Sequence, residues 1–281
     1  MTAAGGLETG ASQPAAVRRT IAHLFAWIAL IGRPPRRRTR RGRFRPGGSA
    51  AIGALLAVVM VGTAMVFLDA VAFAAQGQLP TLMVDVFNEI TDYGKSGWFL
   101  WPSGVLILVL AAVARPALGR VSNLVIVSLA VRLEFLFLAV AGPGLLVTVC
   151  KRLIGRVRPS ELGPFAYEPF SWRAEYAGLP SGHGTTAFAA AIAIGALWPR
   201  VRPLMWLYAV IIALSRVIIG AHYPSDVIAG AFVGTVGALL VRNFFAARGR
   251  GFAVRPNEAV CALPGPSLRR IKRVVGRIIG H

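Results

Sequence analysis

The stretch Leu179–Trp198, LPSGHGTTAFAAAIAIGALW, joins two kinds of sequence. Its last twelve residues are apolar or glycine, as in a membrane helix. Its first eight are small, polar and turn-forming, and include His183, one of only four histidines in the chain. Polar groups near the membrane boundary are costly without a role. The stretch therefore predicts a membrane helix whose first turn carries function.

The whole chain has the composition of a membrane protein. Of its 281 residues, 56% are hydrophobic and 15% are charged, and the mean hydropathy is +0.63, which is too apolar for an ordinary soluble domain. The net charge of +20 gathers at the two ends: residues 1–49 hold ten Arg and one Glu, and residues 242–281 hold nine Arg or Lys and one Glu. Such tails fit anionic membrane lipids. They could also bind nucleic acid, but no aromatic-basic pattern supports that, so we expect no nucleic-acid partner.

Six apolar segments reach spanning length when their polar ends are included. They are Ala50–Leu68, Trp98–Ala114, Leu133–Cys150, Gly184–Trp198, Pro203–Ile219 and Val227–Val241. Arginines of the short connections and of both tails fall on one side, which the positive-inside rule makes cytoplasmic. The sequence thus predicts an all-α, multi-pass protein of the bacterial inner membrane. We expect a six-helix domain over 50–245, between a basic cytoplasmic segment 1–49 and a basic cytoplasmic tail 246–281.

Both tails contain a candidate helix. The apolar run 21–32 is followed directly by an arginine block, which is unusual for a signal peptide and favours a short interfacial helix. Near the C-terminus, the apolar residues that share a helical face among cations are Leu268, Ile271, Val275 and Ile278. This pattern fits an amphipathic helix on an anionic leaflet. A disordered basic tail is an equal alternative.

Polar residues mark the outer ends of the last four predicted helices. Loop 151–183 faces outward yet holds five cations, against the positive-inside rule, which suggests an anion to bind. The residues that should meet at this depth are Lys151, Arg158, Ser181, Gly182, His183, Ser215, Arg216, His222 and Asp226. We interpret two neighbours, Arg152 and Arg156, as solvated interface charges, and Asp69 as an outer boundary residue.

These residue types suit a phosphate ligand. Arg158 and Arg216 can grip phosphoryl oxygens with paired donors, and Lys151 adds a point charge. The free N–H groups where Ser181 and Gly182 begin a helix favour an anion. Such a cage stabilises the charge of a phosphoryl group in transfer. No set of carboxylates suits Mg²⁺ beside it, so we expect no metal and no cofactor.

The two histidines can divide the chemistry. Asp226 lies four residues after His222 and can accept from one ring nitrogen, which leaves the other nitrogen as a nucleophile. His183 can give a proton to the leaving alkoxide and then take one from water. Ser215 either touches the phosphate or satisfies a backbone group of its own helix.

The three motifs resemble a family signature. The chain reads K-x6-RP at Lys151–Pro159, PSGH at Pro180–His183 and SR-x5-H-x3-D at Ser215–Asp226. This is similar to the signature of the type 2 phosphatidic acid phosphatase and haloperoxidase superfamily, with every signature residue present in order. The resemblance implies a phosphohistidine mechanism with the histidine roles given above. It also implies that the phosphate lies among the cations and the PSGH turn.

The sequence therefore predicts a lipid phosphatase with its site facing the outside of the inner membrane. Candidate substrates are undecaprenyl diphosphate, phosphatidic acid, phosphatidylglycerophosphate and the phosphates of lipid A. A phosphotransferase using the same residues and a non-catalytic lipid-phosphate binder or transporter are the alternatives. The aromatic side chains of 165–176 form either a lid over a lipid headgroup or a simple interfacial anchor. The sequence does not indicate the oligomeric state.

Overall fold

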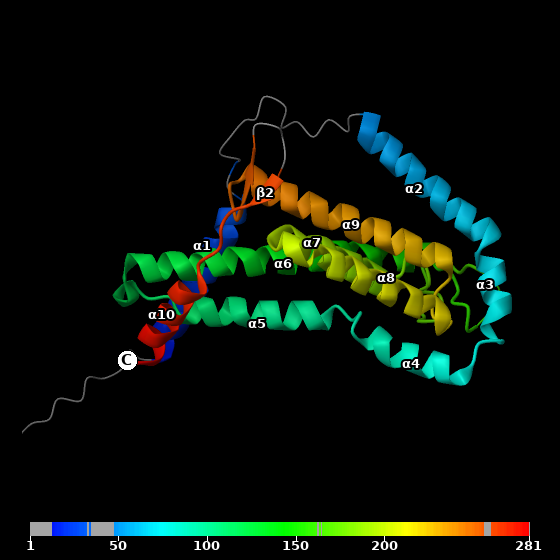
Figure 1. Ribbon diagram of the computed structural model, residues 1–281, viewed down its shortest axis with the longest axis horizontal. Coiled ribbons are helices and arrows are strands. Elements are labelled where there is room, and N and C mark those ends of the chain that lie inside the picture. The colour runs from blue at the N-terminus through cyan, green and yellow to red at the C-terminus, as the bar shows by residue number, and fades with distance from the viewer. Residues whose placement is uncertain are drawn as a thin grey trace, which may run out of the picture.

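A computed structural model describes residues 13–32, 34, 48–161, 163, 165–255 and 260–280 of the chain. It consists of helices and one small strand hairpin (Figure 1). The elements are α1 Gln13–Gly32, α2 Gly48–Phe67, α3 Asp69–Gln76, α4 Thr81–Asp92, α5 Gly97–Val113, η1 Pro116–Leu118, α6 Gly119–Ile154, α7 Gly182–Leu197, η2 Pro199–Val201, α8 Arg202–Ile218, α9 Pro224–Ala247, β1 Phe252–Val254, β2 Val260–Ala262 and α10 Leu268–Ile279.

The six apolar segments all fall on helices, namely α2, α5, α6, α7, α8 and α9. Within the described residues, four helical stretches are long and apolar enough to cross a membrane, or five if the bent pair α2 and α3 is one span. Helix α7 is apolar but has only 16 residues. The all-α membrane class is confirmed, and the count of six spans stays a prediction.

Helix α7 packs against α6, α8 and α9, and its contact with α9 is very close. A Cβ added to Gly230 of α9 would lie 2.4 Å from the Ser181 carbonyl oxygen, and one on Gly234 would lie 2.3 Å from that of Thr185. Small residues at these positions let two helix backbones approach. The approach holds the first turn of α7 beside the first turn of α9, where the polar motifs lie.

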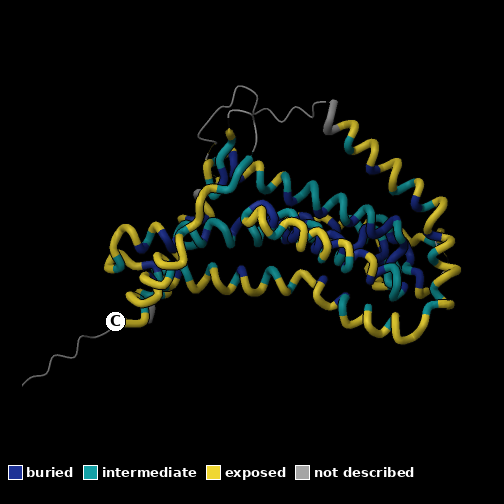
Figure 2. The backbone as a smooth tube through the Cα atoms, viewed as in Figure 1, coloured by how far each residue is buried: buried dark blue, intermediate teal, exposed yellow. Residues whose placement is uncertain are grey.

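The outer helices expose apolar side chains. Figure 2 shows α2 and much of α5 as exposed, whereas buried residues gather along the central helices. The exposed side chains include Leu55, Val58, Trp101 and Leu108. Continuous apolar surface of this kind marks an interaction surface, and a bilayer is the surface that spanning helices meet.

The C-terminal segment is folded against the bundle. Phe252 of β1 packs on Phe135 of α6, with ring centroids 4.7 Å apart. Helix α10 buries Val274 against α6 residues such as Ile126. Of the two alternatives for this tail, the structure has the helix, but two of the four residues on the expected face are exposed. Leu268, the first residue of α10, is 77% exposed. Val275 is 44% exposed, because Val274 takes the position toward α6.

Candidate active site

All nine polar residues singled out in the sequence lie at one end of the bundle. They come from the end of α6 and the following loop, the start of α7, the end of α8, and the turn into α9. In Figure 1 this is the end where α3 and α4 lie, opposite α10. The charged neighbours of His183 include Arg216, His222 and Lys151, so the three motifs meet.

Three cations surround this end without carboxylate partners. Among the described residues, Lys151, Arg158 and Arg216 form no ion pair within 4.0 Å. The Nε atoms of Arg158 and Arg216 are buried and make no hydrogen bond within the described chain. Burial lowers the pKa of Arg158, partly offset by Asp226. Buried donors without acceptors are costly, and an anion placed among them would satisfy them.

His222 is held beside a carboxylate in the turn before α9. Its Nδ1 lies 3.6 Å from Asp226 Oδ2, and the side chain is 2% exposed. That separation is longer than a hydrogen bond, and such contacts often tighten only when substrate binds. Burial lowers the pKa of His222 to about 4, although Asp226 opposes the shift and Arg216 and Arg158 add to it. The imidazole is therefore neutral at pH 7, as a nitrogen nucleophile must be.

For Arg156 the interpretation from the sequence is wrong. Instead of a solvated charge, it is fully buried, with Nη1 2.6 Å from Asp226 Oδ1 and Nη2 2.7 Å from Asp69 Oδ2. Its Nη1 also donates to Ser225 Oγ at 2.7 Å, and its guanidinium lies 4.5 Å from the Tyr223 ring centroid. Burial alone would lower the pKa of Arg156, but Asp226 and Asp69 raise it above its usual value.

Asp69 is correspondingly not a boundary residue. It is fully buried at the start of α3, accepts from the Ser225 backbone N–H at 3.1 Å, and binds the Ser225 hydroxyl. The sequence gives no signal for this pairing, because Asp69 and Arg156 are 87 residues apart and belong to no shared motif. The bonds of Arg156 fix Oδ1 of Asp226, and the Tyr223 backbone N–H fixes Oδ2 at 3.0 Å. The carboxylate that faces His222 is thus held from both sides.

The first turn of α7 has the form of an anion site. The Ser181 hydroxyl caps the helix by accepting from the Gly184 N–H at 3.3 Å. The Ser181 N–H donates to the Asp226 carbonyl oxygen at 2.9 Å, so it is engaged. The backbone N–H groups of Gly182 and His183 have no hydrogen-bond acceptor in the described chain. A Cβ on Gly182 would lie 3.5 Å from Lys151 Nζ, which places the free N–H groups next to the cations.

Two further hydroxyls complete the surroundings. Ser215 is fully buried and donates to the Ile212 carbonyl oxygen at 2.7 Å, which is the helix-satisfying role. Thr91 of α4, which the sequence did not single out, accepts from Arg216 Nη1 at 2.9 Å. Helix α4 therefore orients one of the phosphate-binding candidates. In the described ranges, no three His, Cys, Asp or Glu side chains gather in a way that could hold a metal ion.

Comparison with known proteins assigns the family. Residues 133–250 match the model of the PAP2 superfamily. The chain is 35% identical over 174 residues to a lipid A 1-phosphatase of Rhizobium johnstonii, covering 60% of this chain and 70% of that protein. It is 33% identical over 203 residues to a lipid A 1-phosphatase of Rhizobium etli, covering 70% of this chain and 85% of that one. The crystal structure of Aquifex aeolicus LpxE aligns with a TM-score of 0.44 and 22% identity, over 61% of this chain and 92% of that chain.

The apolar helices and the named relatives define a membrane phosphatase. The chain belongs to the PAP2 superfamily, as the three motifs indicated. The matched region contains every residue of the motifs but not Asp69, so the buried partner of Arg156 comes from outside it.

Proposed function

We propose that this protein removes the phosphate from position 1 of a lipid A-type glycolipid, through a phosphohistidine on His222. Two relatives that share 35% and 33% of their aligned residues with this chain carry the name lipid A 1-phosphatase. The observation that carries the chemistry is the buried His222 beside Asp226, inside a ring of cations that have no carboxylate partner. A binding protein would need the cations but not the oriented imidazole.

The reaction takes two displacement steps at phosphorus. The Nε2 lone pair of His222 attacks phosphorus, the bond from phosphorus to the lipid oxygen breaks, and His183 gives that oxygen a proton. The first products are the dephosphorylated lipid and phosphohistidine. Water then attacks phosphorus while His183 takes its proton, and the bond to Nε2 breaks to release inorganic phosphate. Asp226 stabilises the charge on the imidazole ring throughout.

Arg156 and Asp69 act as positioning residues in this proposal. Asp226 can orient His222 only if its own carboxylate is fixed, and Arg156 supplies the 2.6 Å contact that does so. A lone Arg–Asp pair would leave part of the guanidinium unsatisfied in a dry site. Asp69 and Ser225 accept hydrogen bonds from two further donors of the guanidinium. Arg156, Asp69 and Ser225 thus keep the geometry of the His222–Asp226 pair without touching the substrate.

The surface beside the site fits a lipid substrate. Exposed aromatic side chains project from the loop between α6 and α7, including Phe165, Phe170 and Trp172, and the last is 83% exposed. Rings of this kind favour the membrane interface. We infer that this loop lies at the outer headgroup level, with both termini in the cytoplasm. Reaction of single cysteines introduced at Trp172 and at Arg200 with a membrane-impermeant thiol reagent in intact cells tests this: only the first should react.

The test uses the full chain purified in detergent with EDTA present. Phosphate release is followed for lipid A, undecaprenyl diphosphate, phosphatidic acid, phosphatidylglycerophosphate and one soluble phosphate ester. The wild type should prefer lipid A and lose only its 1-phosphate, His222→Ala should be inactive, and His23→Ala on α1 should keep full activity. Phosphate that leaves the lipid but appears on an added acceptor would instead identify a phosphotransferase. No release from any lipid by folded protein would favour the binder or transporter.

A further inference from the structure

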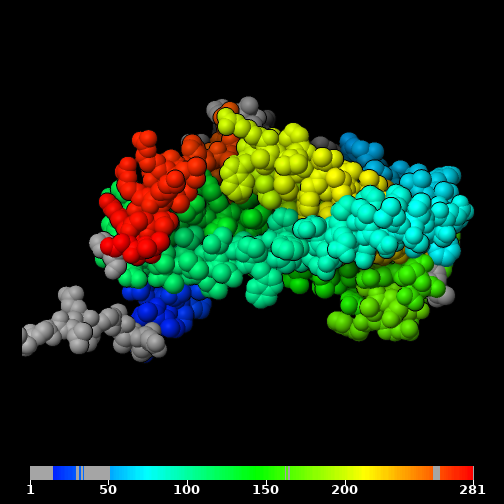
Figure 3. All heavy atoms as spheres, turned by 60° about the horizontal axis from the view of Figure 1, so that its bottom comes forward, coloured from blue at the N-terminus to red at the C-terminus, as the bar shows by residue number. Residues whose placement is uncertain are grey.

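A second basic cavity lies at the end of the molecule opposite the histidines. It has a volume of about 790 Å³ and lies between the start of α6 and the segment that leads into α10. Figure 3 shows α10 in red at one end of the long axis and the loop after α6 in green at the other. Along α6, Leu124 in the cavity and Lys151 in the active site are separated by about 40 Å at 1.5 Å per residue. The cavity is therefore independent of the catalytic site.

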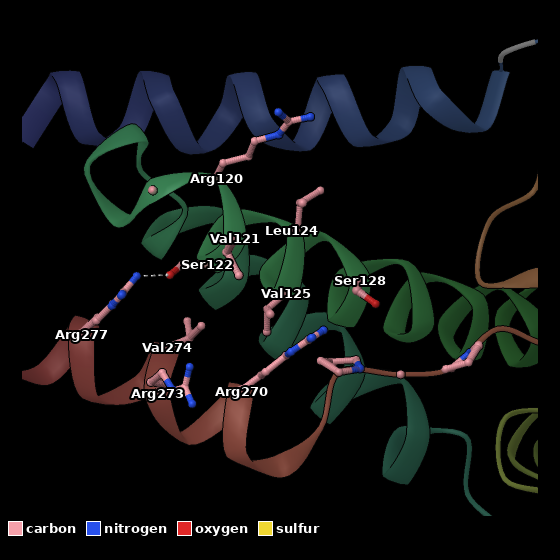
Figure 4. A pocket seen from close by; sticks show the side chains of 14 residues that line it. Arg120, Val121, Ser122, Leu124, Val125, Ser128, Arg270, Arg273, Val274 and Arg277 are labelled. Carbon is pink, nitrogen blue, oxygen red and sulfur yellow. Dashed lines mark hydrogen bonds between the residues drawn. The ribbon is translucent and has the colours of Figure 1, made fainter.

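The charged side of this cavity is one face of α10. Arg270, Arg273 and Arg277 line it at spacings of three and four residues, on either side of the buried Val274. Cations at these spacings repel one another along a helix. Arg277 donates to Ser122 Oγ at 3.1 Å, and Figure 4 shows this bond and the extension of Arg270 from α10 toward α6.

Within the described part of the chain, no acidic side chain balances these arginines. The described residues that line the cavity include four arginines and no Asp or Glu. The side chains of Arg270 and Arg273 make no hydrogen bond or ion pair with any described residue, and α10 holds five cations and no anion in twelve residues. Arg270 also lies in the first turn of α10, where the helix dipole favours negative charge. The missing component is an anion with several acceptor oxygens, such as a phosphate.

The other wall of the cavity is apolar and continues onto the membrane-facing surface. It includes Val121, Leu124 and Val125 of α6, and the first two are exposed by 66% and 59%. Helix α6 has 36 residues, or about 54 Å of helix, against a hydrocarbon core of about 30 Å. When the Lys151 end lies at one membrane face, this wall reaches the headgroup level of the other. An apolar wall beside an arginine face matches a phospholipid better than a free ion.

We propose that this cavity binds the phosphate headgroup of an anionic phospholipid from the leaflet opposite the active site. Arg270 and Arg273 would hold the phosphate oxygens, Arg277 and Ser122 would close one side, and an acyl chain would lie along Val121 and Leu124. Bound lipid would fasten α10 to α6 and so anchor the C-terminal segment. The inference does not depend on which lipid the catalytic site hydrolyses.

The experiment measures lipid binding by native mass spectrometry of the full chain released from detergent micelles. The wild type is titrated with phosphatidylglycerol, phosphatidylcholine and inorganic phosphate. The double variant Arg270→Gln/Arg273→Gln is compared with Arg269→Gln/Lys272→Gln, which removes the same charge from the same helix outside the cavity lining. Phosphatase activity in detergent should be unchanged in both variants, which confirms folding.

The proposal expects one phosphatidylglycerol to bind the wild type and the control variant alike, and tenfold more weakly or not at all to the cavity variant. Phosphatidylcholine should bind the wild type less well, because its headgroup carries no net charge. Equal loss in both double variants would mean general attraction to a basic helix and would overturn the site. Inorganic phosphate binding as tightly as the lipid would overturn the lipid assignment.

Discussion

Arg156 and Arg270 lie at opposite ends of the molecule, and their surroundings differ in burial and in charge. Arg156 is fully buried and contacts two carboxylates at 2.6 and 2.7 Å. Arg270 is exposed in a cavity whose lining has no carboxylate. The protein supplies counter-charges where an atom must be held in place, as at Asp226. Where the described arginines have no carboxylate partner, at the predicted phosphate site and in the α10 cavity, a ligand from outside can supply the negative charge.

The largest effect on activity should follow from loss of the proposed nucleophile, His222, which lies at the end of the molecule where Arg156 is paired with carboxylates. In His222→Ala no covalent intermediate can form, and we expect kcat to fall by roughly 10⁴-fold or more. His23→Ala is the matched control, because this histidine lies on α1, where its Nδ1 contacts the Ala111 carbonyl oxygen at 2.9 Å. Residual activity of His222→Ala within tenfold of wild type would remove His222 from the mechanism.

Breaking the charge balance at Arg156 should have the next largest effect. Truncation to Ala leaves two buried carboxylates without their cationic partner, a change that costs about 3–5 kcal/mol in stability. Arg156→Lys keeps the charge but cannot reach both carboxylates and Ser225. We expect this variant to fold and to lose about 100-fold in kcat with KM within threefold of wild type. Steady-state kinetics on detergent-solubilised lipid substrate measure both constants.

The control for that variant is Arg152→Lys, because Arg152 precedes the same loop but donates to the carbonyl oxygens of Trp172 and Arg173. Its kcat should stay near the wild-type value. If Arg156→Lys instead raised KM and left kcat unchanged, Arg156 would act on substrate binding and not on the dyad.

Asp69→Asn removes one of the two carboxylates that contact Arg156, and so tests how much of the effect of Arg156 depends on Asp69. The amide oxygen can still accept from the Ser225 N–H, and Arg156 keeps its bond to Asp226. We therefore expect only about a tenfold loss in kcat, roughly 1.4 kcal/mol of transition-state stabilisation. The double variant Asp69→Asn/Arg156→Lys should lose less than the product of the single losses, because the two residues act through one contact. Strictly multiplicative losses would show that they act separately.

The pH dependence should reveal the burial of His222. An unfolded histidine protonates near pH 6.5, whereas burial lowers the pKa of His222 to about 4. Between these values the unfolded chain binds the proton more readily, so stability falls as the pH drops from about 6.5 to 4, by about 3 kcal/mol in total. NMR of labelled histidine side chains, with His222→Gln to assign the signal, should show titration near pH 4. A titration midpoint of His222 near pH 6.5 would contradict a buried imidazole that is neutral at pH 7.

The three sequence motifs were visible because each of them is local. Lys151 to Pro159, Pro180 to His183 and Ser215 to Asp226 each contain spacings that place polar groups at helix ends, and the six apolar segments order those ends in space. The structure gathers these residues at one end of the bundle. The free N–H groups of the first turn of α7 follow from the small polar residues that begin it.

The contacts of Arg156 and Asp69 that fix Asp226 could not be predicted from the sequence, for a physical reason. Asp69 and Arg156 lie 87 residues apart, and each has the sequence surroundings of an ordinary interface charge. Only the fold shows that both are withdrawn from solvent. Asp69, at the start of α3, contacts Arg156, which lies in the loop after α6 and contacts Asp226 in turn. The same holds for the face of α10, where residues 274 and 275 are both valine and periodicity cannot decide which of them turns toward α6.

The central claim is that His222, held by the buried carboxylate cluster, carries the phosphoryl group. The most direct measurement mixes wild-type enzyme with lipid substrate labelled with ³²P in the phosphate, stops the reaction in alkali within milliseconds, and maps the labelled peptide. We predict a label that is stable to alkali, lost in acid, and confined to the peptide that contains His222, with none in His222→Ala. Rapid phosphate release with no labelled protein at any time, or a label on another residue, would contradict it.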